Sequence, residues 1–185
     1  AARLDKPMMV FVGCEDDTNS ELRELEDVVF ADERVQLGAK FFDCVKMNPG
    51  DCEQDRLLKE EGRRYPRLVF VDCDYKVVSV LEGHKISGGK VIRAMQTVVR
   101  SEYETNFDRM VKEYRKLLDE LDRLDSKRAY IADQKARLAE KQDARRERKI
   151  QRDEEELEAE MAEWNKKEQE VLQLRRKGQE APAQS

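Results

Sequence analysis

The sequence predicts an α/β protein in which a mixed sheet flanked by helices is followed by one long charged α-helix. Short apolar runs bounded by proline or glycine, which are typical of buried strands, alternate with segments of helical spacing. Only a tight turn separates the last two apolar runs, so their strands must be antiparallel. Beyond them, neither glycine nor proline occurs between Gly89 and Gly178, which favours continuous helix.

The composition divides the chain of 185 residues into unequal parts. Charged residues make up 42% of the chain and hydrophobic residues 39%, and the excess of charge lies beyond residue 100. We therefore expect a domain over 1–100, a helical segment over 101–177 and a flexible tail over 178–185. The net charge is −5, without a sustained basic field, and no apolar run reaches the roughly 18 residues that a bilayer requires. These features argue against nucleic-acid binding and against a membrane span.

The expected elements of the first domain alternate along the chain. Thr18 and Glu21 fit a capping box, in which the threonine oxygen accepts a backbone N–H and the glutamate reaches back to the cap. The first two strands flank a helix and are therefore expected to be parallel, with a right-handed crossover. In chain order we expect a strand over 7–13, a helix over about 19–30, a strand over 39–47, a helix over 53–61, strands over 67–72 and 76–82, and a helix from residue 90.

Three segments of this domain resemble one known fold. Lys6-Pro7 precedes the first strand, residues 26–35 close the first helix, and Tyr65-Pro66 stands directly before an apolar strand. Together they resemble the thioredoxin fold over about residues 1–100. The resemblance implies that Pro66 is the family's cis-proline, an isomer that X–Pro bonds adopt at modest cost.

The chain lacks the chemistry of that family. Thioredoxin-like enzymes carry Cys-x-x-Cys at the start of the first helix, where the helix dipole favours a reactive thiolate. Counting back from Glu26, the matching positions are near Asn19 and Leu22, and no Cys-x-x-Cys occurs anywhere in the chain. The resemblance therefore implies a redox-inactive domain, and the sequence assigns it no cofactor and no metal site.

The four cysteines leave one catalytic candidate. Cys14 follows the first strand, but the acidic residues next to it disfavour a thiolate, so a structural thiol is the favoured interpretation. Cys14 and Cys52 are both expected beyond the ends of parallel strands, which leaves a disulfide between them as an alternative. Cys44 is expected to be a small core residue, and Cys73 is expected at the opposite end of the sheet.

The long helix carries an apolar seam in its first half. A second seam, out of phase with the first, begins at Leu157, and Ser101 with Glu104 fits a cap, which predicts a kink near residue 101. The first seam can pack against its own domain, against a second copy, or against the returning half of a hairpin that turns between 139 and 153. Its residues recur in coiled-coil steps at Tyr103, Phe107, Met110, Tyr114, Leu117, Leu121, Leu124, Ile131 and Leu138.

Charge blocks in the second half bear on that choice. Residues 145–152 are mostly basic and residues 153–160 are mostly acidic. A parallel in-register pair of helices sets like charges together, whereas an antiparallel pair that crosses near Arg152 and Asp153 matches opposite charges. A single solvated helix, held by ion pairs four residues apart, is the alternative without a partner.

These features favour a non-catalytic interaction or assembly module on a coiled-coil stalk, which binds a protein partner or a second copy through its long helix. One alternative is a thiol redox protein that uses Cys14 alone. Another is an adaptor of the ubiquitin pathway, because Tyr65-Pro66 and Leu81-Glu82-Gly83 look similar to the thioredoxin-like UAS domains. The chain starts at Ala1 without an initiator methionine, so we expect a longer natural N-terminus, and cytoplasmic and exported locations both stay open.

Overall fold

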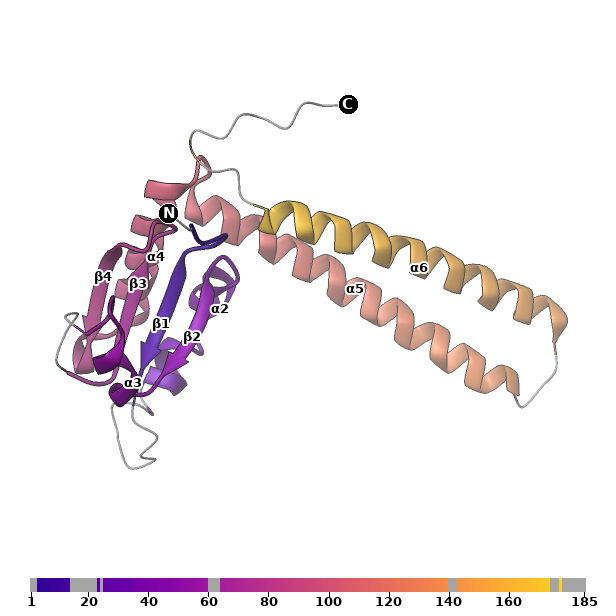
Figure 1. Cartoon of the computed structure of the whole chain (residues 1–185). Helices are drawn as coiled ribbons and strands as arrows, with labels where there is room; N and C mark the ends of the chain where they lie inside the picture. Colours follow the sequence, from indigo (N-terminus) through magenta and orange to yellow (C-terminus); the bar gives the residue numbers. More distant parts are fainter. Residues whose placement is uncertain are drawn as a thin grey trace. The chain divides into compact units, whose positions relative to one another are not determined.

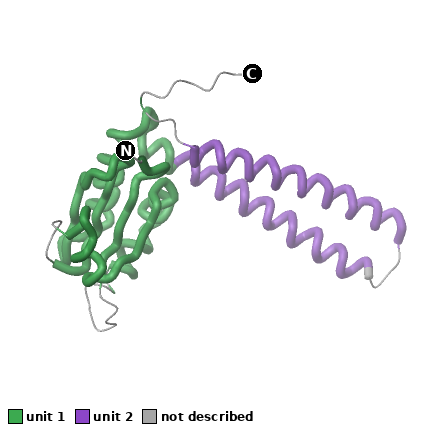
Figure 2. Tube along the Cα trace, in the orientation of Figure 1, with its two compact units in different colours: residues 1–111, 174–185 green, residues 112–173 purple. Residues whose placement is uncertain are grey.

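The computed structural model describes residues 3–13, 23, 25–59, 64–139, 143–173 and 177. The chain divides into two compact units, which are coloured separately in Figure 2. The sheet unit comprises residues 1–111 and 174–185, and the hairpin unit comprises residues 112–173. The chain therefore leaves the sheet unit after Val111 and returns to it after Gln173.

The sheet unit contains one four-stranded mixed sheet (Figure 1). β1 and β2 pair in parallel, β3 runs antiparallel to β1, and β4 runs antiparallel to β3. The parallel first pair and the antiparallel last pair predicted from the sequence are therefore confirmed. In the spatial order β2-β1-β3-β4, the strands are Asp43–Met47, Met8–Val12, Arg67–Val71 and Val77–Glu82.

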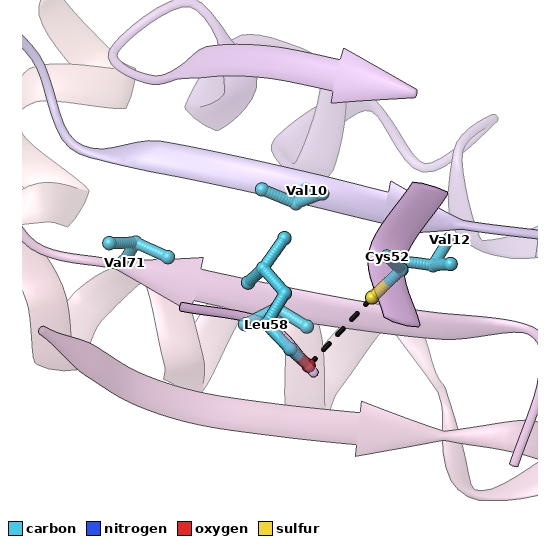
Figure 3. Close-up of a cluster of buried hydrophobic side chains, with 6 residues drawn as sticks. Val10, Val12, Cys52, Leu58 and Val71 are labelled. Carbon is cyan, nitrogen blue, oxygen red and sulfur yellow. Dashed lines mark hydrogen bonds between the residues drawn. The ribbon is translucent and has the colours of Figure 1, made fainter. Parts of the chain in front are cut away.

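One face of the sheet is covered by α3 (Pro49–Gln54) and the turn that follows it. The buried cluster on this face takes alternate residues of β1 and β3, because successive strand side chains point to opposite faces. Cys52 and Leu58 pack with these valines, as Figure 3 shows. The buried members of the cluster are Val10, Val12, Cys52, Leu58, Val69 and Val71.

The other face is covered by α2 (Glu33–Ala39) and α4 (Gly88–Glu102), which also contact each other. Phe70 of β3 meets Phe42 edge to face in this layer, with 6.1 Å between the ring centroids. Gly38 of α2 lies so close to Phe107 that an added Cβ would stand 2.6 Å from the ring carbon Cζ. The absence of a side chain at Gly38 therefore lets residue 107 pack into the sheet unit.

The position predicted for one helix is wrong. The sequence indicated a helix over 53–61, but α3 begins at Pro49, whose fixed φ and missing N–H suit the first helical position. Asp55 ends α3, and its carboxylate then accepts the N–H of Leu57 at 2.8 Å and that of Leu58 at 3.0 Å. These two leucines therefore lie on a turn that is held by a side chain, outside any helix.

A second difference concerns the start of β2, which was expected at residue 39. α2 begins after Asp32, whose carboxylate accepts two backbone N–H groups of the first turn, and it continues to Ala39. β2 therefore begins only at Asp43. Residues 40–42 between the helix and the strand belong to neither, and Phe41 and Phe42 are buried in the core.

The helix expected over about 19–30 is described only in its last part. Leu25–Val29 form a π-helical turn, in which the two end residues are buried. Thr18 and Glu21 lie outside the described residues, so the capping box stays a prediction.

The predicted interruption of the long helix is present, but its cap differs. α4 ends at Glu102, and the Ser101 hydroxyl donates to a carbonyl of that same helix instead of capping a new one. α5 (Phe107–Ala139) begins after Asn106, whose side-chain oxygen accepts the N–H of Asp108 at 2.8 Å. Neither glycine nor proline marks this break, which is why helix breakers alone did not place it.

The hairpin unit contains α5 from residue 112 onward and α6 (Ala144–Leu172), which run antiparallel (Figure 1). Leu117 of α5 bonds to Trp164 of α6, and Lys127 bonds to Glu160, so the partner numbers fall along α6 as they rise along α5. Of the arrangements that the sequence left open, the chain adopts the hairpin.

Candidate functional site

The carboxyl end of β1 brings together residues from three elements. Val12, the last residue of β1, pairs with Arg67, the first residue of β3, and α3 places Cys52 beside them. Ligands and catalytic groups of open α/β sheets gather at the carboxyl ends of the strands. Cys14 follows Gly13 in the sequence at this end, but it lies outside the described residues and stays a prediction.

Arg67 is buried at this end of the sheet, with 1% of its surface exposed. Its Nη2 donates to the sulfur of Cys52, and its guanidinium carbon lies 5.0 Å from the centre of the Tyr65 ring. A buried guanidinium needs such partners, because moving an unpaired charge out of water is costly. Sequence reasoning missed this residue, since arginine at the start of a strand is ordinarily exposed.

Pro66 lies directly before Arg67. The Tyr65–Pro66 peptide bond is cis, as the sequence predicts. Pro66 is buried, and its carbonyl accepts the N–H of Gly83 at 2.7 Å. This bond joins the entry of β3 to the end of β4.

The three described cysteines, Cys44, Cys52 and Cys73, form no disulfide. Cys52 is fully buried, with its sulfur 3.8 Å from the carbonyl oxygen of Leu58, and its free thiol gives no support to a disulfide with Cys14. Cys73 is buried 3.9 Å from the Tyr103 hydroxyl. It follows β3 beside the start of β1, which confirms its predicted place at the opposite end of the sheet.

Cys44 corrects the expectation of a core residue. It lies on β2, which is an edge strand, and it is exposed. Its thiol donates to the carbonyl oxygen of Ala39 at 3.6 Å. Partial burial of the sulfur, and then the Asp43 carboxylate, raise the pKa of the Cys44 thiol, which disfavours the reactive thiolate.

The apolar seam that was expected to bind a partner packs within this chain. In the hairpin, Trp164 Nε1 donates to the Leu117 carbonyl at 2.7 Å, and the Tyr114 hydroxyl donates to Glu168 at 2.8 Å. The outer faces of the helices, more than the seam, are therefore available to a partner. Of the predicted residues, Tyr103, Phe107, Met110, Tyr114, Leu117, Leu124 and Ile131 are buried, whereas Leu121 and Leu138 are partly exposed.

The acidic block of α6 pairs with α5. Lys127 Nζ lies 3.0 Å from a carboxylate oxygen of Glu160 and 3.5 Å from one of Glu156. Lys135 forms a further pair with Glu154. Over the residues that the structure describes, the acidic block therefore pairs with cations of α5 in the same chain, and not with the basic block that the sequence had matched to it.

The basic block lies at the start of α6, next to the turn of the hairpin. Its five cations are exposed, and they line a hollow of about 870 Å³. Among the described residues, the ion pair that this block makes joins Arg146 to Asp143, the N-cap residue of α6, at 3.4 Å. These cations form a basic tip, which consists of Arg145, Arg146, Arg148, Lys149 and Arg152.

The described residues contain no group of three His, Cys, Asp or Glu side chains that is placed to hold a metal ion. His84, the sole histidine of the chain, is exposed on a short 3-10 turn after β4. In the same part of the chain, every helix is too short or too polar to cross a bilayer.

No protein-family model and no curated protein matches this sequence. Among solved structures, the chain is similar to an oxidoreductase named DsbH. The two share 13% sequence identity over 52% of this chain and 74% of that chain, with a TM-score of 0.41. So distant a likeness assigns neither a fold nor an activity to this chain.

Proposed function

We propose that this chain is a thioredoxin-like module that binds a protein partner and catalyses no reaction. The order of strands and helices in the sheet unit, with a parallel first pair and an antiparallel last pair, agrees with the thioredoxin fold that the sequence resembles. In this proposal the sheet unit is a scaffold, and the hairpin is the binding arm.

The observation that carries the proposal is the closed environment of Cys52. Thiol–disulfide exchange requires an accessible thiolate that can attack a sulfur of the substrate. Cys52 has no exposed surface, and it lies between the guanidinium of Arg67 and the carbonyl of Leu58. The described part of this end of the sheet is therefore packed as a core.

The hairpin supplies a surface of the kind that binding requires. The apolar side chains of its seam pack against each other inside the hairpin. The side chains that remain on its outer faces are largely charged. The basic tip concentrates positive charge near the turn, and such a patch attracts acidic surfaces and speeds their encounter. We infer that the basic tip contacts an acidic surface of the partner.

Thiol chemistry tests the non-catalytic part of the proposal. In an insulin-reduction assay with dithiothreitol, the protein should give no rate above that of dithiothreitol alone. A matched assay of Cys14→Ser controls for the candidate cysteine. A rate enhancement that this substitution abolishes would establish the single-cysteine redox protein in place of the binding module.

A comparison of the partners that the native protein and a variant capture tests the proposed role of the hairpin as the binding arm. The native protein and Arg145→Gln/Arg148→Gln/Arg152→Gln should be immobilised and exposed to nuclease-treated lysate of the source organism. The proposal expects the native protein to retain a partner that the triple variant loses. A control variant, Lys59→Gln/Lys76→Gln/Lys90→Gln, removes three exposed cations of the sheet unit and should retain the partner. Equal capture by all three proteins would remove the basic tip from the proposal.

A further inference from the structure

The outer edge of β2 is a binding feature that the proposed arm does not use. β2 stands at the end of the sheet order, and β1 is its strand partner in the described part of the chain. Residues 43–46 are exposed. Edge strands with open backbone groups pair readily with an added strand unless something covers them.

Two hydrogen bonds define which backbone groups face that edge. The N–H of Asp43 donates to the Pro7 carbonyl at 2.9 Å, and the N–H of Gly13 donates to the Met47 carbonyl at 3.3 Å. In a parallel ladder, alternate residues of a strand bond to the same neighbour. Residues 43, 45 and 47 therefore bond to β1, and the N–H and C=O groups of Cys44 and Lys46 point to the open edge.

An apolar hollow of about 340 Å³ lies beside the same edge, between β2 and α2. Cys44 and Lys46 line its rim. A volume of this size falls in the range of pockets that hold small ligands or large side chains. Most of its wall is apolar and comes from Met9, Phe11, Phe30, Val35 and Ala39.

The edge and the hollow suit the same ligand. Side chains of directly opposed residues on neighbouring strands lie on the same face of a sheet. A strand that bonds to the outward groups of Cys44 and Lys46 therefore places its opposed side chains on the face that carries the hollow. We propose that β2 binds an extended segment of a partner protein by strand addition, with one large apolar side chain of that segment in the hollow.

The positive charge at the rim of the hollow indicates which residues the bound segment carries beside its apolar side chain. Lys46 lines the hollow, and Lys40 and Lys6 both act electrostatically on the neighbouring Cys44. Asp43 belongs to the alternate set of side chains, which points to the opposite face. The complementary segment therefore carries acidic residues next to its apolar anchor.

The same geometry disfavours a second copy of this chain as the occupant. Two β2 strands paired antiparallel about Val45 would set Cys44 of each copy opposite Lys46 of the other. Neither copy would then supply a large apolar side chain to the hollow, and the two basic rims would approach each other. The occupant is a partner of different sequence, and its binding does not depend on the basic tip.

A synthetic peptide tests the proposal with the full chain. The probe is a fluorescein-labelled peptide of alternating valine and glutamate in which phenylalanine replaces the central glutamate, so that the anchor and the acidic side chains lie on the same face of the strand. We expect the fluorescence anisotropy of the peptide to rise to saturation as protein is added. The bound peptide should also slow the alkylation of Cys44, measured by mass spectrometry, at least fivefold. The same peptide with N-methylated backbone amides, or with asparagine in place of phenylalanine, should bind at least tenfold more weakly.

Variants of the protein separate the backbone contact from the hollow. Lys46→Pro removes an outward N–H that β1 does not use, and proline is accepted on edge strands, so binding should fall at least tenfold. Lys46→Ala keeps this N–H and removes only the charge at the rim, so it should bind less tightly than the native protein and more tightly than Lys46→Pro. Ala39→Leu fills the hollow from α2 and should also weaken binding. Circular dichroism of each variant establishes that it is folded.

Three outcomes would overturn the proposal. The first is an absence of binding by the phenylalanine peptide, and the second is equal binding by its N-methylated form. The third is a dimer of the native protein, measured by light scattering, that Lys46→Pro dissociates, because the second copy would then be the occupant. A redox rate in the insulin assay would remove the proposed function and leave the β2 result standing.

Discussion

Glycine 38 illustrates how one residue without a side chain decides the packing of two helices. An added Cβ would lie 2.6 Å from Phe107 Cζ and 2.8 Å from Met95 Sδ, closer than real Cβ contacts come. Both neighbours are buried, so neither can move without disturbing the core. Nothing in the local sequence distinguished this glycine from one in a turn.

Gly38→Ala should therefore destabilise the protein. We expect a loss of about 1–3 kcal/mol in the free energy of unfolding, the usual cost of overpacking a core. Gly50→Ala is the matched control, because an added Cβ there meets nothing within 4 Å and alanine favours helix. Urea titration of both variants measures the difference. Equal midpoints for the two variants would contradict the packing described for residue 38.

Tyr114 should make stability depend on alkaline pH. Burial, together with the hydrogen bond and charge of Glu168, raises the pKa of Tyr114 to about 12. A group with a higher pKa in the folded state stabilises that state fully below its unfolded value, near 10 for tyrosine, and loses this contribution as pH rises through the folded value. The free energy of unfolding of the native protein should thus fall above pH 10, and that of Tyr114→Phe should fall less. Urea titrations at pH 9, 10 and 11 compare the two slopes, and identical slopes would argue against the shift.

At the scale of elements, three strands of the sheet were predictable, whereas the start of β2 and the helix ends were not. β1, β3 and β4 follow apolar runs, and such runs are a local signal. α3 was misplaced because Leu57 and Leu58 suggested a helix, while the stronger signal was Pro49 at the first helical position. The Cys52–Arg67 contact was not predictable, since it depends on where α3 packs against the start of β3.

The choice of a hairpin is also an element-scale result. The seam from Tyr103 to Leu138 predicted packing, and it has the same spacing whether the second helix comes from this chain or from another. The discriminating contacts are long-range ones, such as Lys127 with Glu160. Sequence spacing within one helix carries no information on them.

Acid should weaken the hairpin through Glu160. The hydrogen bond from Lys127 lowers the pKa of Glu160, so its stabilising contribution is present above the unfolded value and is lost as pH falls through the folded one. Glu160→Gln should therefore unfold with a weaker dependence on pH between 5 and 3 than the native protein. Trp164, the sole tryptophan of the chain, reports the transition by fluorescence. Glu155→Gln is the control on the exposed face and should keep the native dependence on pH.

At the scale of the whole molecule, the two compact units predict regional effects of core substitutions. Leu124, with 1% of its surface exposed, belongs to the hairpin unit, and Val69, with none exposed, belongs to the sheet unit. Truncation of such residues to alanine costs about 2–5 kcal/mol where a cavity is left. Each loss should be concentrated in the unit that contains the substitution.

Hydrogen exchange measured by mass spectrometry can separate the two effects. Leu124→Ala should speed amide exchange in residues 112–139 and 143–173 more than in β1 and β3. Val69→Ala should do the reverse. Uniform acceleration of exchange throughout the chain by either variant would mean that the two units unfold as one.

The antiparallel course of α5 and α6 has a consequence for how such a chain can change in evolution. The chain comes back to α4 after the hairpin, where the N–H of Lys177 donates to the Glu102 carbonyl at 3.0 Å. A heptad deleted from each helix at facing positions would shorten the hairpin by about 10 Å and keep its seam in phase. The residues at which the chain leaves the sheet unit and returns to it would stay the same. The strands would therefore need no compensating change. The length of the hairpin can therefore change in steps of one heptad per helix while the sheet unit stays the same.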